Sequence, residues 1–256
     1  MTLLYSKYIQ YIVSINNLYF LILGYRVGSK MSNEAVIQVD SLVKKYKDVT
    51  AVNGVSFTVN RGEVFSFVGP NGAGKTTVMK VMTGYLEPTA GTIRIDSQSI
   101  SCARRQIQQK IGYLPENCPV YPEMSILDYL DYCAALHGIV EQERPALIRE
   151  AVERTALAEK AAEQIATLSR GYRQRAGVAQ AILHKPEILI LDEPTNGLDP
   201  TQILQMRSLI KELAKTKTVV LSTHILAEVE KLCDRVTIIR HGRTVQCGTL
   251  DDLRAT

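Results

Sequence analysis

Two short stretches of the chain carry residue types that could bind a phosphate group together with a divalent metal ion. Lys75 and Thr76 stand in the first, which reads Gly69-Pro70-Asn71-Gly72-Ala73-Gly74-Lys75-Thr76-Thr77. Asp192 and Glu193 form the second, directly after four aliphatic residues at 188–191. Ammonium, hydroxyl and carboxylate groups can neutralise phosphate, ligate Mg²⁺ and activate water. Together the two stretches predict a site of phosphate chemistry.

The glycine-rich stretch follows the pattern G-x-x-x-x-G-K-T of the phosphate-binding P-loop. Its glycines let several backbone N–H groups point at one anion, and a helix that begins near Gly74 adds its positive end. Lys75 would then reach the β- and γ-phosphates of a nucleotide, and Thr76 would ligate Mg²⁺. A glycine-rich turn that matches by accident is the alternative. The strand expected at 64–68 and the helical spacing of 78–82 favour the P-loop.

The acidic pair is expected at the carboxyl end of a buried strand. An unbroken aliphatic run is typical of a strand covered on both faces, and ligands bind outside the carboxyl ends of such strands. Asp192 would hold Mg²⁺ through its water shell, and Glu193 would polarise the water that attacks the γ-phosphate. A surface acidic pair at a strand end is the alternative, and the upstream P-loop argues against it.

Length, charge and cysteine content exclude several classes of protein. The 256 residues are enough for one large α/β domain, or for a core with a small inserted subdomain. The net charge is +4, and residues 1–30 supply three of these charges, so the remainder is nearly neutral. This balance argues against binding of nucleic acid. No C-x-x-C pair occurs, so we expect reduced thiols of a cytosolic protein, each a small buried hydrophobe, at Cys102, Cys118, Cys133, Cys233 and Cys247.

Residues 1–30 differ in composition from everything that follows. They hold five of the twelve tyrosines and no acidic residue. Polar residues interrupt their apolar run, which is therefore too short for a membrane span of about 20 apolar residues. No small-residue cleavage site of a signal peptide follows. Three alternatives stay open: Met31 is the true start or the extension is disordered, the extension anchors the chain at a membrane surface, or it packs on the body.

The order of the expected elements predicts the architecture. The first strands are expected at 35–42, 54–59 and 92–96, and helices at 125–136, 143–157 and 172–183. An antiparallel start of this kind differs from a plain doubly wound sheet, in which strands and helices alternate throughout. We predict an α/β fold for a domain at 31–256, with a mixed core sheet, an antiparallel N-terminal portion and a helical subdomain inserted at about 117–175.

A third stretch, Leu168-Ser169-Arg170-Gly171-Tyr172, lies between the two sites. With it the chain resembles, over about residues 35–250, the ATP-binding subunit of ATP-binding-cassette (ABC) transporters, which carry an L-S-G-G-Q-type stretch at this place. The resemblance implies a P-loop ATPase with a RecA-like core. It also implies that Ser169 and Gly171, at a helix N-terminus, face the γ-phosphate bound by a second subunit. An ordinary N-capped helix is the alternative, and the order of the three motifs favours the ABC interpretation.

The same resemblance implies roles for single residues. Tyr46 would stack on adenine. His224, after the strand expected at 218–221, would contact the γ-phosphate and orient Glu193. Asp199 closes the loop Asn196-Gly197-Leu198-Asp199, which would communicate with the second subunit.

Two departures from the family pattern concern the nucleotide site. Glu116 stands where glutamine is usual; its carboxylate could coordinate Mg²⁺, and it would repel the γ-phosphate until the metal screens that charge. Arg170 and Tyr172 replace the usual glycine and glutamine. Arg170 would either add a charge-assisted contact to phosphate or point into water. Both variants are similar to a branch of ABC exporters that includes gliding-motility, drug and antibiotic export ATPases.

The predicted function is hydrolysis of ATP, with Mg²⁺ as cofactor, to drive export through a separate integral membrane permease. We expect a homodimer, bound at the cytoplasmic face of the membrane, with no nucleic acid partner. The permease would dock between the core and the helical insertion, near 116–127, where Tyr121, Pro122 and Met124 are expected to be exposed. A soluble ABC ATPase of DNA repair or translation is the rival, but such proteins carry long insertions or two cassettes. A purely binding or structural role conflicts with the filled catalytic positions.

Overall fold

The structure, a computed structural model, describes residues 34–254. The extension at 1–30, with its three alternatives, lies outside the described residues. The strands are β1 Ala35–Tyr46, β2 Val49–Asn60, β3 Val64–Val68, β4 Ala90–Ile95, β5 Gln98–Ser99, β6 Ile111–Leu114, β7 Ile188–Asp192, β8 Thr218–Thr223, β9 Arg235–Arg240 and β10 Arg243–Thr249. The helices are α2 Lys75–Met82, α3 Ile100–Lys110, α4 Ile126–Leu136, α5 Arg144–Arg154, α6 Arg170–Ile182, α7 Pro200–Ala214, α8 Leu226–Leu232 and α9 Leu250–Arg254, with 3-10 turns at Ala158–Lys160 and Ile165–Thr167.

The N-terminal portion is a four-stranded antiparallel sheet in the order β2-β1-β4-β5. Along β1, Ile37 pairs with Val59 of β2 on one side and with Ile95 of β4 on the other. All three of these side chains are fully buried, so the register places the apolar face of the sheet on the core. The predicted antiparallel start is confirmed. Both β1 and β2 extend further than expected towards the turn that joins them.

A six-stranded mixed sheet in the order β10-β9-β3-β8-β7-β6 forms the second layer. Strands β3, β7 and β8 are buried at every position because both of their faces are covered. The parallel register pairs Val68 with Thr223 and Asp192 with Ser222. The carboxyl ends of β3, β7 and β8 therefore lie side by side, and each is followed by one of the predicted motifs.

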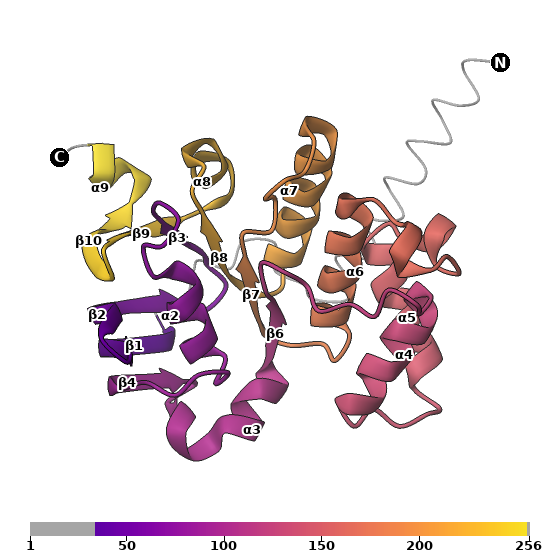
Figure 1. The fold of residues 1–256 in the computed structure, drawn as a ribbon, viewed down its shortest axis with the longest axis horizontal. Coiled ribbons are helices and arrows are strands. Elements are labelled where there is room, and N and C mark those ends of the chain that lie inside the picture. The colour runs from indigo at the N-terminus through magenta and orange to yellow at the C-terminus, as the bar shows by residue number, and fades with distance from the viewer. Residues whose placement is uncertain (1–33, 255–256) are drawn as a thin grey trace, which may run out of the picture. The chain divides into compact units, whose positions relative to one another are not determined.

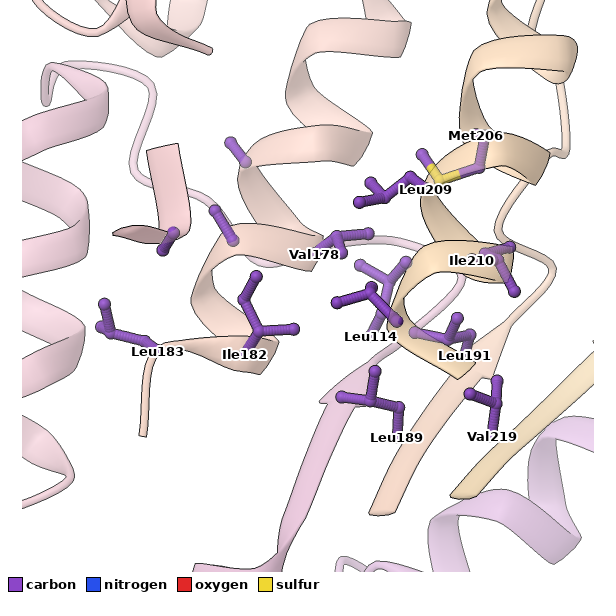
Figure 2. Packing of buried hydrophobic residues seen from close by; sticks show 14 of the residues in the cluster. Leu114, Val178, Ile182, Leu183, Leu189, Leu191, Met206, Leu209, Ile210 and Val219 are labelled. Atoms are coloured by element: carbon purple, nitrogen blue, oxygen red, sulfur yellow. The ribbon is translucent and has the colours of Figure 1, made fainter. Parts of the chain in front are cut away.

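One face of this mixed sheet packs against α6 and α7, and Figure 2 shows this packing. Leu189 and Leu191 of β7 point from the sheet towards these helices. They meet Val178 of α6 and Ile210 of α7, which are also fully buried. The strand that ends in the acidic pair is thus held by the apolar core, and its carboxyl end has little freedom to move.

Three helices, α4, α5 and α6, separate β6 from β7 in the chain and lie beyond β6 in Figure 1. Ser125 caps α4 by accepting a hydrogen bond from the Asp128 N–H, and Ser169 caps α6 by accepting one from the Tyr172 N–H. The helical portion expected from the sequence is thus present, and α6 continues to Ile182, against β6. Among residues 34–254, every helix is too short or too polar to span a bilayer.

The structure differs from the sequence analysis in one helix and in the exposure of three residues. Helix α3 was not predicted, because only Ile100 and Ile107 on it are buried and the remainder is polar. Cys102 and Cys247 are exposed rather than buried, since they lie on the outer faces of α3 and of edge strand β10. Met124 is half-buried and packs against the core cluster instead of being exposed.

Candidate active site

The predicted P-loop joins the carboxyl end of β3 to the first turn of α2. Gly72 and Gly74 have positive φ values of 78° and 108°, which L side chains rarely adopt. A Cβ on Gly69 would lie only 2.2 Å from the backbone oxygen of Ile239, so the chain can pass here only without a side chain. Asn71 and Gly72 are exposed. The loop therefore turns its backbone outward directly before a helix N-terminus, and this geometry fits a bound phosphate.

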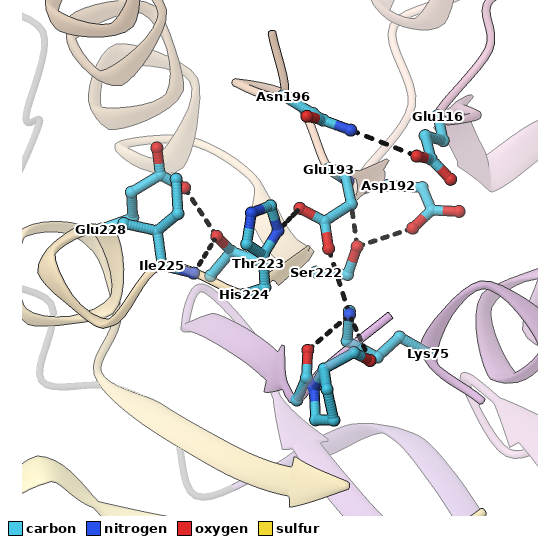
Figure 3. A network of polar contacts seen from close by, with 12 residues as sticks. Lys75, Glu116, Asp192, Glu193, Asn196, Ser222, Thr223, His224, Ile225 and Glu228 are labelled. Carbon is cyan, nitrogen blue, oxygen red and sulfur yellow. Dashed lines mark hydrogen bonds and ion pairs between the residues drawn. The ribbon is translucent and has the colours of Figure 1, made fainter. Parts of the chain in front are cut away.

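The ammonium group of Lys75 lies inside this loop, with only 5% of the residue exposed. It donates to the Gly69 carbonyl over 2.7 Å and to the Pro70 carbonyl over 3.3 Å. It also pairs with Glu193, with 3.2 Å between Nζ and Oε1. Figure 3 shows this contact between two residues that the sequence had assigned to separate motifs. The structure thus brings the P-loop lysine and the expected base together.

Glu193 is held in an uncommon backbone conformation, with a φ of 48°. A residue other than glycine at such an angle costs on the order of 1–3 kcal/mol, which the surrounding contacts must offset. Its N–H donates to the Ser222 hydroxyl over 2.9 Å, and its Oε2 lies 2.9 Å from His224 Nδ1. The histidine donates through Nδ1, since a carboxylate can only accept. One carboxylate oxygen thus faces Lys75 and the other faces His224.

Asp192 lies beside Glu193 and is completely buried. Its Oδ1 accepts from the Ser222 hydroxyl over 2.6 Å, and Thr76 also hydrogen-bonds to its carboxylate. Its Oδ2 is buried and has no hydrogen-bond partner among the described residues. Burial raises the pKa of Asp192, and the hydrogen bonds from Ser222 and Thr76 lower it only in part. A buried, incompletely satisfied carboxylate next to a hydroxyl is a suitable place for a cation.

Thr76 and Asp192 therefore fit the chemistry of a Mg²⁺ site. Glu116 is half-buried in the loop after β6, and its Oε1 accepts from the Asn196 side chain over 3.2 Å. Within residues 34–254, no group of three or more acidic, histidine or cysteine residues forms a complete metal cage. This agrees with the habit of Mg²⁺ in phosphate sites, where one or two protein ligands act together with phosphate oxygens and water.

Other predicted residues lie on separate elements, and their roles stay predictions. Tyr46 ends β1 with 43% exposure, and the Lys44 ammonium lies 5.3 Å from the centre of its ring. Ser169 is exposed at the N-cap of α6. Asp199 caps α7, where it accepts a hydrogen bond from the Gln202 N–H over 2.8 Å. Thr77 is half-buried in the first turn of α2.

Arg170 is exposed at the start of α6, and its guanidinium also lies close to the loop after β7. A Cβ on Gly197, which follows Asn196 in the loop after β7, would lie 2.6 Å from the guanidinium carbon of Arg170. The guanidinium therefore covers Gly197 of the same chain. Gly171 is similarly covered, because a Cβ there would lie 2.5 Å from the Gln202 side chain. The start of α6 is thus packed directly onto the loop after β7 and the first turn of α7.

Sequence reasoning missed several residues that hold these groups in place. Ser222 bridges Asp192 and Glu193, although only the neighbouring His224 had been given a role. The Thr223 hydroxyl donates to the buried carboxylate of Glu228 over 2.8 Å and fixes the end of β8. The only available signal was position, since Ser222 and Thr223 end a buried strand next to β7.

Comparisons with known proteins agree with this geometry. Residues 52–196 match the family model described as ABC transporter. The chain is 38% identical over 219 residues to the uncharacterized ABC transporter ATP-binding protein YxlF of Bacillus subtilis, covering 86% of this chain and 72% of that protein. It is 36% identical over 215 residues to the Nod factor export ATP-binding protein I of Burkholderia lata, covering 84% and 71%.

The fold of this chain is also similar to that of a solved ABC transporter subunit. That subunit is cbiO1 from Clostridium perfringens, part of the ABC transporter complex cbiONQ, which matches with a TM-score of 0.77 and 28% identity over 87% of this chain and 92% of that one. The family match, the relatives and the placement of the P-loop beside the acidic pair all point to one assignment. The chain belongs to the ABC transporter family and is one of its ATP-binding, ATP-hydrolysing subunits.

Proposed function

We propose that this subunit hydrolyses MgATP as part of a homodimer and thereby powers export through a separate membrane permease. The observation that carries the chemistry is the convergence of Lys75, Asp192, Glu193 and His224 at the ends of β3, β7 and β8. The direction of transport rests on relatives such as the Nod factor export ATP-binding protein. Peripheral attachment to the cytoplasmic face of the membrane follows from the need for a permease.

Each residue of the cluster has a task in this proposal. The P-loop backbone and Lys75 bind the phosphates, so that Lys75 exchanges its contact with Glu193 for one with phosphate. Thr76 and Asp192 would hold Mg²⁺, which would supply positive charge to neutralise the phosphoryl group. Glu193 orients the attacking water and accepts its proton. His224 restricts rotation of the Glu193 carboxylate through the hydrogen bond from Nδ1.

The permease is expected to meet a groove of about 800 Å³ beside α3, β6 and the C-terminal end of α4. The charged residues in its lining are Lys80 and Arg105, and within the described part of the chain no aspartate or glutamate lines it. Tyr85, 74% exposed, and Leu136, 70% exposed, add apolar surface. The lining therefore favours a permease segment that carries acidic side chains beside an apolar one.

The test is co-expression with a candidate permease, taken from a neighbouring gene that encodes one. The chain should enter the membrane fraction only when the permease is present, and efflux should cease with Glu193→Gln. Arg105→Glu should weaken membrane association and leave the ATPase rate of the isolated chain unchanged, whereas Arg94→Glu, at an exposed position of β4, should affect neither. A chain that ignores the permease and shows ATPase activity stimulated by nucleic acid would instead support a role in DNA repair or translation.

A further inference from the structure

Three carboxylates converge near the nucleotide site, and each has its own hydrogen-bond donor. Asp192 accepts from Ser222, and Glu193 from His224. Glu116 accepts from the Asn196 side chain, with 3.2 Å between Nδ2 and Oε1, and Figure 3 draws this contact. Like charges this close repel one another unless a donor or cation holds each in place. Asn196 thus donates a hydrogen bond to Glu116, as Ser222 does to Asp192.

Asn196 is itself firmly placed. Its backbone N–H donates to the Glu193 carbonyl over 3.0 Å, which closes a tight turn directly after the acidic pair. The next residue, Gly197, lies under the Arg170 guanidinium. The orientation of the Asn196 amide is also fixed, because a rotated amide would set its oxygen against a carboxylate oxygen. The side chain can therefore serve only as a donor to Glu116.

We infer that Asn196 is a positioning residue, which holds the Glu116 carboxylate towards the loop after β7 and away from the phosphates of the bound nucleotide. A glutamine at position 116 would not need this donor, since its amide is neutral. A carboxylate does need it, because a freely rotating negative charge would oppose the binding of MgATP. The inference rests on the proposed nucleotide site. It adds an explanation of how MgATP can bind although a negatively charged Glu116 lies near that site.

The experiment reverses the donor and the acceptor and measures KM and kcat for MgATP in the isolated full-length chain. Asn196→Asp places two carboxylates against each other, so KM should rise about tenfold while kcat stays within about threefold. Adding Glu116→Gln should return KM to within about twofold of the Glu116→Gln single variant, because the glutamine amide can donate to the carboxylate introduced at position 196. Asn117→Asp, which adds the same charge at the exposed neighbour of Glu116, should leave KM unchanged.

A second pair keeps the inference testable if Asn196→Asp does not fold, as judged by its melting temperature. Asn196→Ala should raise KM about threefold, and Glu116→Gln in that background should remove the rise. The inference is overturned if Glu116→Gln fails to rescue either variant, or if Asn117→Asp raises KM as much as Asn196→Asp does. Glu193→Gln serves as the independent check, since its loss of turnover tests the site itself and not the role of Asn196.

Discussion

The two oxygens of Glu193 face two different donors, and this arrangement limits what can replace the residue. Oε1 lies 3.2 Å from the Lys75 ammonium, and Oε2 lies 2.9 Å from His224 Nδ1. An amide in place of the carboxylate would turn one NH₂ group towards one of these donors. Glutamine would therefore lose both the base and its orientation, although it has the same shape.

We predict that Glu193→Gln lowers the ATP turnover rate by roughly 10² to 10⁴, the usual contribution of a general base, while ATP binding is retained. Steady-state ATPase assays and binding of a fluorescent ATP analogue would measure the two quantities. The exposed Glu159→Gln should behave as the unchanged protein. Turnover that stays unchanged in Glu193→Gln would contradict the assignment.

Gly197 carries a second prediction at the scale of single residues. Its φ of 70° disfavours any L side chain, and a Cβ would meet Arg170 at 2.6 Å. Gly197→Ala should therefore lower the free energy of unfolding, measured with denaturant, by roughly 1 kcal/mol, chiefly through backbone strain. The contact with Arg170 adds little, because the guanidinium is the end of a flexible, exposed side chain and can shift. Arg170→Ala in the same chain should leave this loss nearly unchanged, and a double variant as stable as Arg170→Ala alone would contradict the assignment to backbone strain.

At the scale of elements, the sequence predicted the strand ends well and the contacts between loops poorly. Buried strands such as β7 can be predicted from unbroken aliphatic runs, and neighbouring parallel strands have their carboxyl ends at the same edge of the sheet. Asp192 and Glu193 were placed for this reason, whereas the role of His224 came from the family resemblance. The bond from Asn196 to Glu116 and the position of Arg170 depend on loop conformations, which leave no periodic signal in the sequence.

The helical portion meets the core at a pair of stacked imidazoles. The rings of His137, at the end of α4, and His184, after α6, lie 3.9 Å apart between centroids, with 10° between their planes. His184 Nε2 lies 3.1 Å from the Ile111 carbonyl of β6. Burial, helped by His137 and Lys217, lowers the pKa of His184 to about 4, and burial also lowers the pKa of His137.

This depressed pKa predicts a loss of stability in acid. The unfolded chain takes up a proton on His184 below pH of about 6.5, whereas the folded chain does so only near its pKa of about 4. The stability contributed by the neutral ring is complete above pH of about 6.5. It is lost as the pH falls towards about 4, by up to about 3 kcal/mol.

Urea denaturation at a series of pH values would measure this effect. His184→Gln keeps a donor for the Ile111 carbonyl but has no proton to bind, so its stability should fall less steeply between pH values of about 6.5 and 4. His241→Asn, in the exposed turn before β10, should keep the slope of the unchanged protein. Equal slopes in all three proteins would exclude His184 as the source.

At the scale of the whole molecule, the P-loop and the anion site predicted at Ser169 lie on different helices. The P-loop begins α2, whereas Ser169 begins α6, and Figure 1 shows these two helices on opposite sides of β6. Ser169 is exposed at its helix N-terminus. If this end of α6 binds the γ-phosphate held by another copy of the chain, each nucleotide site is completed only in the dimer.

The matching prediction is that MgATP brings two copies together when hydrolysis is blocked. Glu193→Gln should elute as a monomer without nucleotide and as a dimer with MgATP, as measured by light scattering after size-exclusion chromatography. Ser169→Asp in that background should abolish the dimer, because aspartate keeps the cap of α6 but places a negative charge opposite the γ-phosphate.

Ser125 supplies the control, since its hydroxyl caps α4 as that of Ser169 caps α6; it also donates to the Asp128 carboxylate over 2.7 Å, so an aspartate at position 125 is the stricter test of helix capping. Ser125→Asp should therefore leave the MgATP-dependent dimer intact. Binding of ATP by the single chain should be equal in both aspartate variants, because the P-loop is unchanged in each. A dimer that survives Ser169→Asp would show that this end of α6 does not face phosphate, and a dimer lost equally in Ser125→Asp would trace the effect to helix capping instead.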